Sequence, residues 1–255
     1  MNDITLTILT VTHNAGDNLR KTLDSLYSQK EVSFNHLIQD AHSTDGSLYF
    51  LNAVSYPFTD VIREVDSGIY DALNRGLKRI PNNHDVLILH AGDTFISPET
   101  LGKLVRAKRE SSSQLVYSNI IYTNKLGKTV RSWRAGYFSW LKMHLGWMPP
   151  HTSILCEKSL FQTFGNFKTN YNISGDYDWL LRVFGSVESR AIHYFDEYTI
   201  AMDLGGLSTS GLQSELNKIK EDRLAIIDNL AKYYLLCLIS KKLRKIHQRV
   251  KIGSI

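Results

Sequence analysis

The chain has 255 residues and 43% of them are hydrophobic, which suffices for one large α/β domain with a sizeable core. The net charge of +5 comes from residues 232–255, which hold seven Lys and Arg and no acidic residue. Without those seven, 23 basic residues face 25 acidic ones, and this slightly acidic body excludes a general nucleic-acid-binding surface.

The first 110 residues are predicted to alternate between strands and helices. We expect strands at residues 4–11, 36–38, 61–65 and 86–89. We expect helices to begin with Asp17 as a cap, after Gly46, at Ile69 and near Ser97-Pro98-Glu99. This alternation predicts parallel βαβ units in an open, doubly wound sheet, and such sheets bind ligands beyond the carboxyl ends of their strands.

The second half has a more mixed pattern. We expect a hairpin of residues 115–122 and 130–133, a strand at 151–156, a helix at 157–164, a helix that Ser174 caps, short strands at 191–195 and 199–202, and a flexible loop at Gly205-Gly206. No repeat or linker divides the chain. We therefore predict one domain, residues 1–211, with a nucleotide-binding half (1–110), an acceptor-binding half (111–211) and a helical tail (212–255).

Three aspartates each follow a predicted strand of the first half. Asp40 and Asp66 come after the second and third strands, and Asp93 ends the stretch "LILHAGD" at residues 87–93. Since parallel strands end at one edge of the sheet, these carboxylates should converge there. Like charges repel one another, so the cluster favours ligands such as a cation or sugar and base donors. Alternatively, each aspartate simply caps the helix that follows it.

Five segments, taken in this order, resemble the inverting glycosyltransferases of family 2, whose GT-A fold is a Rossmann-like α/β domain with a mixed, mostly parallel sheet. They are "TVTHNAGDNLRKTLDSLYSQ" (10–29), "QDAHSTDGS" (39–47), "EVDSGIYDALNRGL" (64–77), "HAGDTF" (90–95) and "SGDYDWLLRV" (174–183). The resemblance covers residues 4–210 and is greatest to the branch that builds bacterial exopolysaccharide and O-antigen units.

The resemblance implies how a nucleotide-sugar donor, most simply a UDP-sugar, would be bound. Val11, Thr12 and His13 would surround the base, and Asp40 would accept a hydrogen bond from the pyrimidine N3–H. Asp66 and Asn74 would lie in a third nucleotide-contacting segment, although Asn74 could instead shape a helix end. His151 would contact the donor sugar, the metal or the acceptor, or be a structural histidine.

The resemblance also implies the catalytic chemistry. Asp93 would be the last acid of the D-x-D motif and bind Mg²⁺ or Mn²⁺ with the donor diphosphate, although Ala91 replaces the first acid. Asp176 would be the general base of the E-D motif, although Gly175 replaces the glutamate. Asp178 points elsewhere on the helix, and we interpret it as structural.

The basic tail has helical periodicity. Its apolar face is Leu236, Ile239, Leu243, Ile246 and Val250, with Lys and Arg around it. Such a helix fits an anionic membrane surface. Alternatively, its apolar face packs on the enzyme or on a second subunit.

The expected protein is cytoplasmic, because no signal peptide opens the chain and its two cysteines form no disulfide-type pattern, and it is peripheral on the inner face of the cell membrane. The expected activity is inverting, β-forming sugar transfer from a UDP-sugar to a polyprenyl-diphosphate-linked oligosaccharide. The alternative is a non-catalytic nucleotide-sugar-binding or scaffold subunit of a polysaccharide assembly complex.

Overall fold

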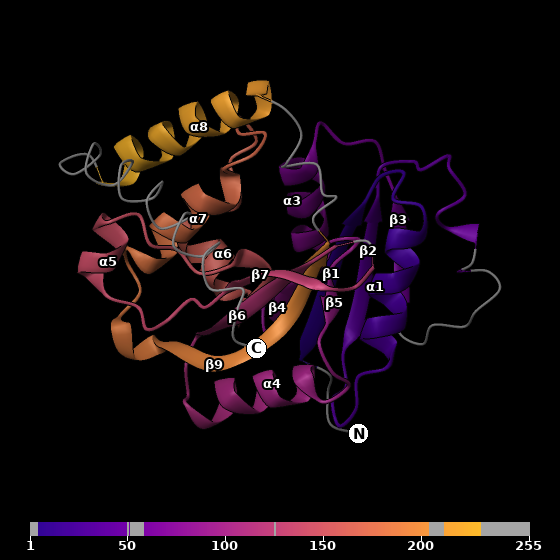
Figure 1. The fold of residues 1–255 in the computed structure, drawn as a ribbon, viewed down its shortest axis with the longest axis horizontal. Coiled ribbons are helices and arrows are strands. Elements are labelled where there is room, and N and C mark those ends of the chain that lie inside the picture. Colours follow the sequence, from indigo (N-terminus) through magenta and orange to yellow (C-terminus); the bar gives the residue numbers. More distant parts are fainter. Residues whose placement is uncertain (1–4, 50, 52–58, 125, 204–211, 231–255) are drawn as a thin grey trace.

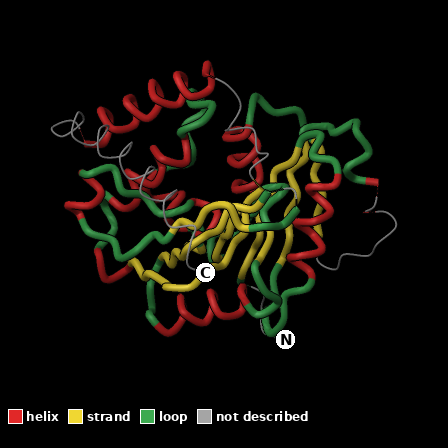
Figure 2. The backbone as a smooth tube through the Cα atoms, viewed as in Figure 1, coloured by secondary structure: helices red, strands yellow, loops and turns green. Residues whose placement is uncertain are grey.

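The computed structural model describes residues 5–49, 51, 59–124, 126–203 and 212–230. Strands within these residues form one mixed sheet, in the order β3-β2-β1-β4-β8-β6-β9-β5 with β7 paired to β6 (Figures 1 and 2). The four strands of the first half are parallel, as predicted, and β6 is parallel to β9. Antiparallel pairs join β8 to its two neighbours, β6 to β7, and β5 to β9.

The first half follows the predicted order closely. Its elements are β1 (Leu6–Thr12), α1 (Asp17–Tyr27), β2 (Asn35–Asp40), β3 (Thr59–Arg63), α3 (Ile69–Arg79) and β4 (Asp85–Ile88). Asp17 is the first residue of α1 rather than its cap, because Gly16 occupies the capping position. The helix predicted after Gly46 falls largely on residues 50 and 52–58, outside the described residues.

The second half departs more from the prediction. After β5 (Thr94–Phe95) and α4 (Thr100–Glu110), which complete residues 1–110, its elements are β6 (Leu115–Thr123), β7 (Thr129–Trp133), α5 (Trp140–His144), η1 (His151–Ser153), β8 (Leu155–Glu157), α6 (Ser159–Phe164), α7 (Gly175–Phe184), η2 (Ser189–Ala191) and β9 (Ile192–Asp203). The helix α8 (Leu212–Leu230) follows in the predicted tail. The two short strands expected at 191–202 are one strand, β9. Its pairing with β6 shifts register near Asn119, and this irregularity interrupts the alternation of side chains.

Two apolar layers cover the sheet. Leu9 and Val11 of β1 pack with α3, α6, α7 and α8 on one face, whereas Leu6 and Ile8 pack with α1 and α4 on the other. Gly76 lets α3 approach β1 closely, because a Cβ atom there would lie 2.4 Å from the side chain of Leu9. Figure 1 shows α4 and α8 on opposite sides of the sheet.

The helix α8 lies across α7 (Figure 1). Its residues Ala225, Ile226 and Leu230 are buried in the same core as α7, so the first part of the predicted tail packs on the domain. The loop at Gly205-Gly206 and the basic face in 232–255 lie outside the described residues. Within the ranges described, none of the helices has the length and apolar character needed to span a membrane.

Candidate active site

A tight turn after β4 places Asp93 at the carboxyl edge of the sheet. The backbone N–H of Asp93 donates to the carbonyl oxygen of His90 at 2.9 Å and closes the turn. Gly92 has a φ of +107°, which a residue with a side chain rarely adopts, and its N–H donates to Thr22 Oγ1 at 2.8 Å. The chain then enters β5, so the stretch "LILHAGDTF" turns back along the sheet edge with its carboxylate between two strands.

The side chain of Asp93 is buried without a complete set of partners. Only 4% of the residue is exposed, and its Oδ2 atom has no hydrogen-bond partner among the described residues. Burial raises the pKa of Asp93 to about 7, against the opposing effects of the His151 charge and a backbone hydrogen bond from His90. Buried polar atoms are normally satisfied, so this oxygen is suited to a ligand that the chain itself does not supply.

His151 and Asp176 form a close pair beside Asp93. The Nδ1 atom of His151 lies 2.9 Å from Oδ2 of Asp176. His151 starts the short helix η1, which Ser153 ties to β6 through two hydrogen bonds with the backbone of Ser118. Asp176 lies in the first turn of α7, where the positive end of the helix dipole stabilises a carboxylate. The predicted strand at 151–156 is therefore wrong at its start, because residues 151–153 form a helical turn.

The two partners shift each other's protonation. Burial raises the pKa of Asp176, but the charge and hydrogen bond of His151, followed by the charge of Lys218 and a backbone hydrogen bond, outweigh it and hold this pKa well below its usual value. Burial lowers the pKa of His151, but Asp176 and then Asp93 outweigh it, and the net shift is upward. Asp176 is consequently a carboxylate at neutral pH, which is the form that accepts a proton.

Tyr70 of α3 holds Asp176 from the opposite side. Its hydroxyl donates to the carbonyl oxygen of Ile173 at 2.7 Å and to Oδ1 of Asp176 at 3.3 Å. The ring fills the space beside Gly175, because a Cβ atom on this glycine would lie 2.8 Å from two ring atoms of Tyr70. The sequence predicted Asp176 but not Tyr70, which belongs to a helix 106 residues away in the chain.

Further side chains surround this cluster. The ring of His90 contacts that of His151 edge-on, with the centroids 5.5 Å apart. Burial raises the pKa of Tyr122, and the charges of Asp93 and Asp176 add to the rise, although Arg131 opposes it. Tyr122 and Arg131 come from the β6–β7 hairpin, where the guanidinium of Arg131 lies 4.7 Å from the centre of the Tyr122 ring.

Asp40 does not present a free carboxylate to a base. The residue is completely buried at the end of β2, and its oxygens accept from the backbone N–H and hydroxyl of Ser43 and from Nε of Arg63, the last at 3.0 Å. Arg63 also donates to the carbonyl oxygen of Ser43 at 2.9 Å. In the structure, Asp40 organises the loop after β2 through these contacts, and its expected hydrogen bond to a base stays a prediction.

Val11 and Thr12 are the last residues of β1, and His13 begins the loop after it. Val11 is part of the core, and His13 is exposed. Thr12 is buried, with an Oγ1 atom that has no partner within the described chain. Gln39 on the neighbouring strand is also fully buried, and neither atom of its amide is hydrogen-bonded to a described residue. Thr12 and Gln39 therefore leave unpaired polar atoms near the sheet edge, and the sequence did not single out Gln39.

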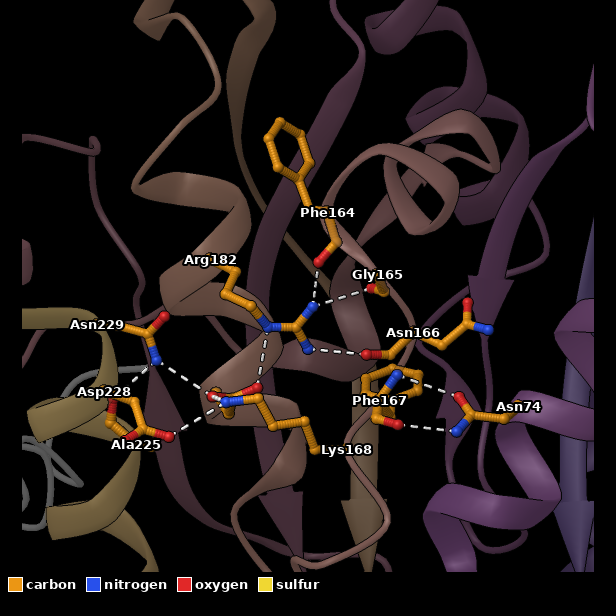
Figure 3. Close-up of polar contacts among 11 residues, drawn as sticks. Asn74, Phe164, Gly165, Asn166, Phe167, Lys168, Arg182, Ala225, Asp228 and Asn229 are labelled. Atoms are coloured by element: carbon orange, nitrogen blue, oxygen red, sulfur yellow. Dashed lines mark hydrogen bonds and ion pairs between the residues drawn. The ribbon is translucent and has the colours of Figure 1, made fainter.

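The recorded hydrogen bonds of Asp66 and Asn74 are to backbone groups outside the Asp93 cluster. Asp66 accepts a hydrogen bond from the N–H of Gly68 and shapes the turn before α3. Both ends of the Asn74 amide bind the backbone of Phe167, at 2.8 and 3.1 Å (Figure 3). This geometry favours the structural alternative for Asn74, because it ties α3 to the loop before α7.

Asp178 has the structural role that was expected. It is completely buried and forms ion pairs with Lys168 at 3.0 Å and with Arg182 at 2.9 Å. Asn229 of α8 donates to it as well, and Figure 3 shows Lys168, Arg182 and Asn229 converging on this point. The network fixes α7 to α8 and to the loop before α7.

Comparisons of the sequence with known proteins identify its family. The profile of Glycosyl transferase family 2 matches residues 7–177. The chain belongs to glycosyltransferase family 2. A PGL/p-HBAD biosynthesis glycosyltransferase of Mycobacterium bovis is 27% identical over 217 residues, which cover 83% of this chain and 82% of the relative.

Solved structures show the same fold as this family 2 transferase. S. aureus TarS 1–349 in complex with UDP-GlcNAc has a TM-score of 0.69 at 14% identity, over 98% of this chain and 77% of that one. The mannosyltransferase PcManGT from Pyrobaculum calidifontis, in complex with GDP-Man and Mn²⁺, has a TM-score of 0.61 at 13% identity, over 98% and 76%. The chain spans 46% of a longer TarS structure. These likenesses confirm the predicted GT-A-like single domain.

The structure explains both departures of this transferase from the family motifs. Ala91 packs against Leu19, Leu23 and Ile38, so an acid at this position would be placed among apolar side chains. Gly175 faces the ring of Tyr70, which excludes any larger residue. Packing therefore accounts for a small residue at each of the two motif positions. The other acid of each motif, Asp93 or Asp176, is present.

A divalent metal fits the residues that are present, within limits. The unpartnered Oδ2 of Asp93 is a suitable oxygen ligand, whereas Nδ1 of His151 is already paired with Asp176. Across the described residues, no group of three His, Cys, Asp or Glu side chains is arranged to hold a metal ion. The chain would therefore supply part of the coordination sphere, and donor phosphates and water would complete it.

Proposed function

We propose that this family 2 enzyme is an inverting transferase that moves a sugar from a nucleotide-sugar donor, a UDP-sugar, to a hydroxyl of a lipid-linked oligosaccharide. The observation that carries the proposal is the pairing of Asp176 with His151 beside the unpartnered oxygen of Asp93. The UDP and UDP-GlcNAc complexes of the structural neighbour TarS support the choice of nucleotide.

In the proposed reaction, the acceptor hydroxyl attacks the anomeric carbon from the side opposite the diphosphate. The new C–O bond forms as the bond to the diphosphate oxygen breaks, and the nucleoside diphosphate leaves with the electron pair. Asp176 takes the hydroxyl proton, and His151 and Tyr70 hold its carboxylate in place. The configuration at the anomeric carbon is inverted, so an α-linked donor gives a β-linked product.

Asp93 would hold Mg²⁺ or Mn²⁺ together with the donor diphosphate, and the ion would supply charge stabilisation for the leaving diphosphate. Mn²⁺ in the complex of the neighbour PcManGT with GDP-Man supports this assignment. The burial of Asp93 strengthens its interaction with a cation, because water screens charges less in such a site.

The alternative function is a non-catalytic scaffold, and its support is the incomplete D-x-D and E-D motifs. The packing of Ala91 and Gly175 offers another reason for these departures. A donor screen separates the two functions. Release of nucleoside diphosphate is measured for each nucleotide-sugar, with acceptor extracts, with Mg²⁺ or Mn²⁺ and with chelator. We expect release with a UDP-sugar that the chelator suppresses. Binding of UDP without turnover of any donor would support the scaffold.

Asp176→Asn tests the assignment of the base. We expect kcat to fall by about 10²- to 10⁴-fold, because the amide cannot take the proton. The dissociation constant for UDP, measured by calorimetry, should stay within a factor of about two. Asp17→Asn is the matched control, since this exposed aspartate also lies in the first turn of a helix. A variant at position 176 with unchanged turnover would contradict the mechanism.

We further propose that the enzyme acts in bacterial surface polysaccharide synthesis, as a peripheral protein on the inner face of the membrane, with residues 212–255 as the helical tail. The mycobacterial relative is named for PGL/p-HBAD biosynthesis, so the acceptor needs its own test. Deleting residues 232–255 removes seven basic residues and should release the protein from anionic vesicles. Co-sedimentation with phosphatidylglycerol vesicles measures this, and continued sedimentation of the shortened protein would refute a membrane-binding tail.

A further inference from the structure

The helix α8 is bonded directly to the segment that carries Asp176, although α8 lies beyond the residues that match the family. The carboxylate of Glu221 accepts hydrogen bonds from three consecutive backbone N–H groups, those of residues 172–174, at 2.8 to 3.0 Å. Asp222 accepts from the hydroxyl of Ser174 at 2.8 Å. These contacts fix one face of α8 against the start of α7.

Lys218 belongs to this same face of α8. It precedes Glu221 by three residues and Asp222 by four, and side chains at these spacings are neighbours on a helix. Lys218 is partly buried, and no hydrogen bond or ion pair joins its side chain to another described residue. An ammonium group has three donors, so this side chain offers an unused cation beside the catalytic pair.

Lys218 lies on the side of the site that carries Asp176, and its charge acts on both Asp176 and His151. After burial and His151, Lys218 is the next influence on the pKa of Asp176, and it also contributes to that of His151. Hydrogen bonds join α8 to residues 172–174 and to Asp178 of α7, whereas Asp93 lies on the turn after β4. Lys218 therefore lies on the Asp176 side of the site.

In an inverting displacement, the base and the leaving diphosphate are on opposite sides of the anomeric carbon. A cation on the side of the base therefore faces the acceptor rather than the donor diphosphate. An ammonium group is a compact point charge that binds phosphate well.

We propose that Lys218 binds a phosphate group of the acceptor, next to the hydroxyl that Asp176 deprotonates. The inference rests on the proposed function, and it narrows the substrate class to acceptors whose phosphate lies close to the reacting sugar. A diphosphate-linked lipid that carries a short saccharide has this chemistry.

Binding of undecyl diphosphate to the UDP-saturated, full-length protein tests the proposal. Saturating UDP blocks the donor site, and calorimetry measures the affinity for the alkyl diphosphate below its micelle concentration. We expect Lys218→Ala to weaken this binding by about tenfold or more, the usual loss for a charge-assisted contact. Lys218→Arg should recover most of the affinity. Lys220→Ala is the matched control, because Lys220 is exposed two residues along the same helix.

The remaining arms distinguish the sources of phosphate. Binding of UDP alone and of neutral undecyl maltoside should be unchanged in Lys218→Ala. A variant that loses UDP affinity but keeps undecyl diphosphate would assign the cation to the donor and overturn the proposal. Equal losses in the Lys218 and Lys220 variants, or no binding of undecyl diphosphate to the natural chain, would also overturn it. Failure of the natural chain to bind UDP would instead refute the proposed function.

Discussion

Asp40 and Asp93 occupy similar places in the fold but have very different surroundings. Each follows a buried strand at the same edge of the sheet, and their exposed fractions are 0% and 4%. The carboxylate of Asp40 is bound by Ser43 and Arg63. Asp93 has one oxygen that no described residue binds, and its neighbours are the His151–Asp176 pair.

The two carboxylates at one sheet edge therefore differ in how far the fold itself satisfies them. A buried carboxylate that is paired with a cation and hydrogen-bond donors recovers the free energy lost when it leaves water. A carboxylate with an unpartnered oxygen keeps part of this desolvation penalty. Protonation relieves that penalty at low pH, and a bound cation would offset it for the ionised form. We infer that Asp40 maintains the loop after β2 and that Asp93 is reserved for a cation.

Asp93→Asn is the strongest test of the comparison. We expect kcat/KM to fall by about 10²- to 10³-fold, as on removal of one preorganised electrostatic contact, because the amide binds a divalent ion poorly. The Asp93→Asn variant should nevertheless be more stable than the natural chain at alkaline pH. A carboxyl titrates near pH 4 in an unfolded chain, whereas its pKa in the folded protein is about 7. The stability contributed by the protonated form is therefore lost as the pH rises through this range.

The measurement is urea unfolding of both proteins at pH 5 and pH 8. The natural chain should lose about 2 to 3 kcal/mol relative to the variant between these two pH values. Parallel stability curves for the two proteins would show that Asp93 is not held at a raised pKa. Full activity of the variant would remove Asp93 from the proposed metal site.

Asp40→Ala should lower the stability of the fold, in contrast to Asp93→Asn. Removing the buried carboxylate leaves Ser43 and half-exposed Arg63 without their acceptor, and we expect the free energy of unfolding to fall by about 2 to 3 kcal/mol. Asp66→Ala is the matched control, since it loses a single hydrogen bond to Gly68 and should lower this free energy by about 1 kcal/mol or less. Urea unfolding at pH 7 measures both. A smaller loss at position 40 than at 66 would contradict the structural role of Asp40.

The sequence was sufficient for the parts of the site that depend on local pattern. Strand–helix alternation placed Asp40 and Asp93 at the carboxyl edge, because parallel strands share a direction. The first turn of α7 placed Asp176, since Ser174 occupies its capping position. Even so, the hydroxyl of Ser174 binds Asp222 instead of capping the helix.

The sequence could not show which of these side chains are satisfied by distant partners. Asp40 is occupied by Arg63 and Asn74 by Phe167, across 23 and 93 residues of chain. The approach of Lys218 to Asp176 depends on how α8 packs on α7, which local periodicity does not specify. The family motifs likewise gave no reason for Gly175, because its reason is the ring of Tyr70.

Tyr70→Phe isolates the hydroxyl that holds Asp176, with the smallest expected effect. The ring still fills the space beside Gly175, so the fold should lose only about 1 kcal/mol for the 2.7 Å hydrogen bond to Ile173. Without the 3.3 Å contact, the carboxylate of Asp176 keeps only its contact with the side chain of His151. Because the base is then held less precisely, kcat should fall by about tenfold while KM for the donor is unchanged. Steady-state kinetics and urea unfolding separate these effects. A rise in donor KM at constant kcat would instead place the Tyr70 hydroxyl in the donor site.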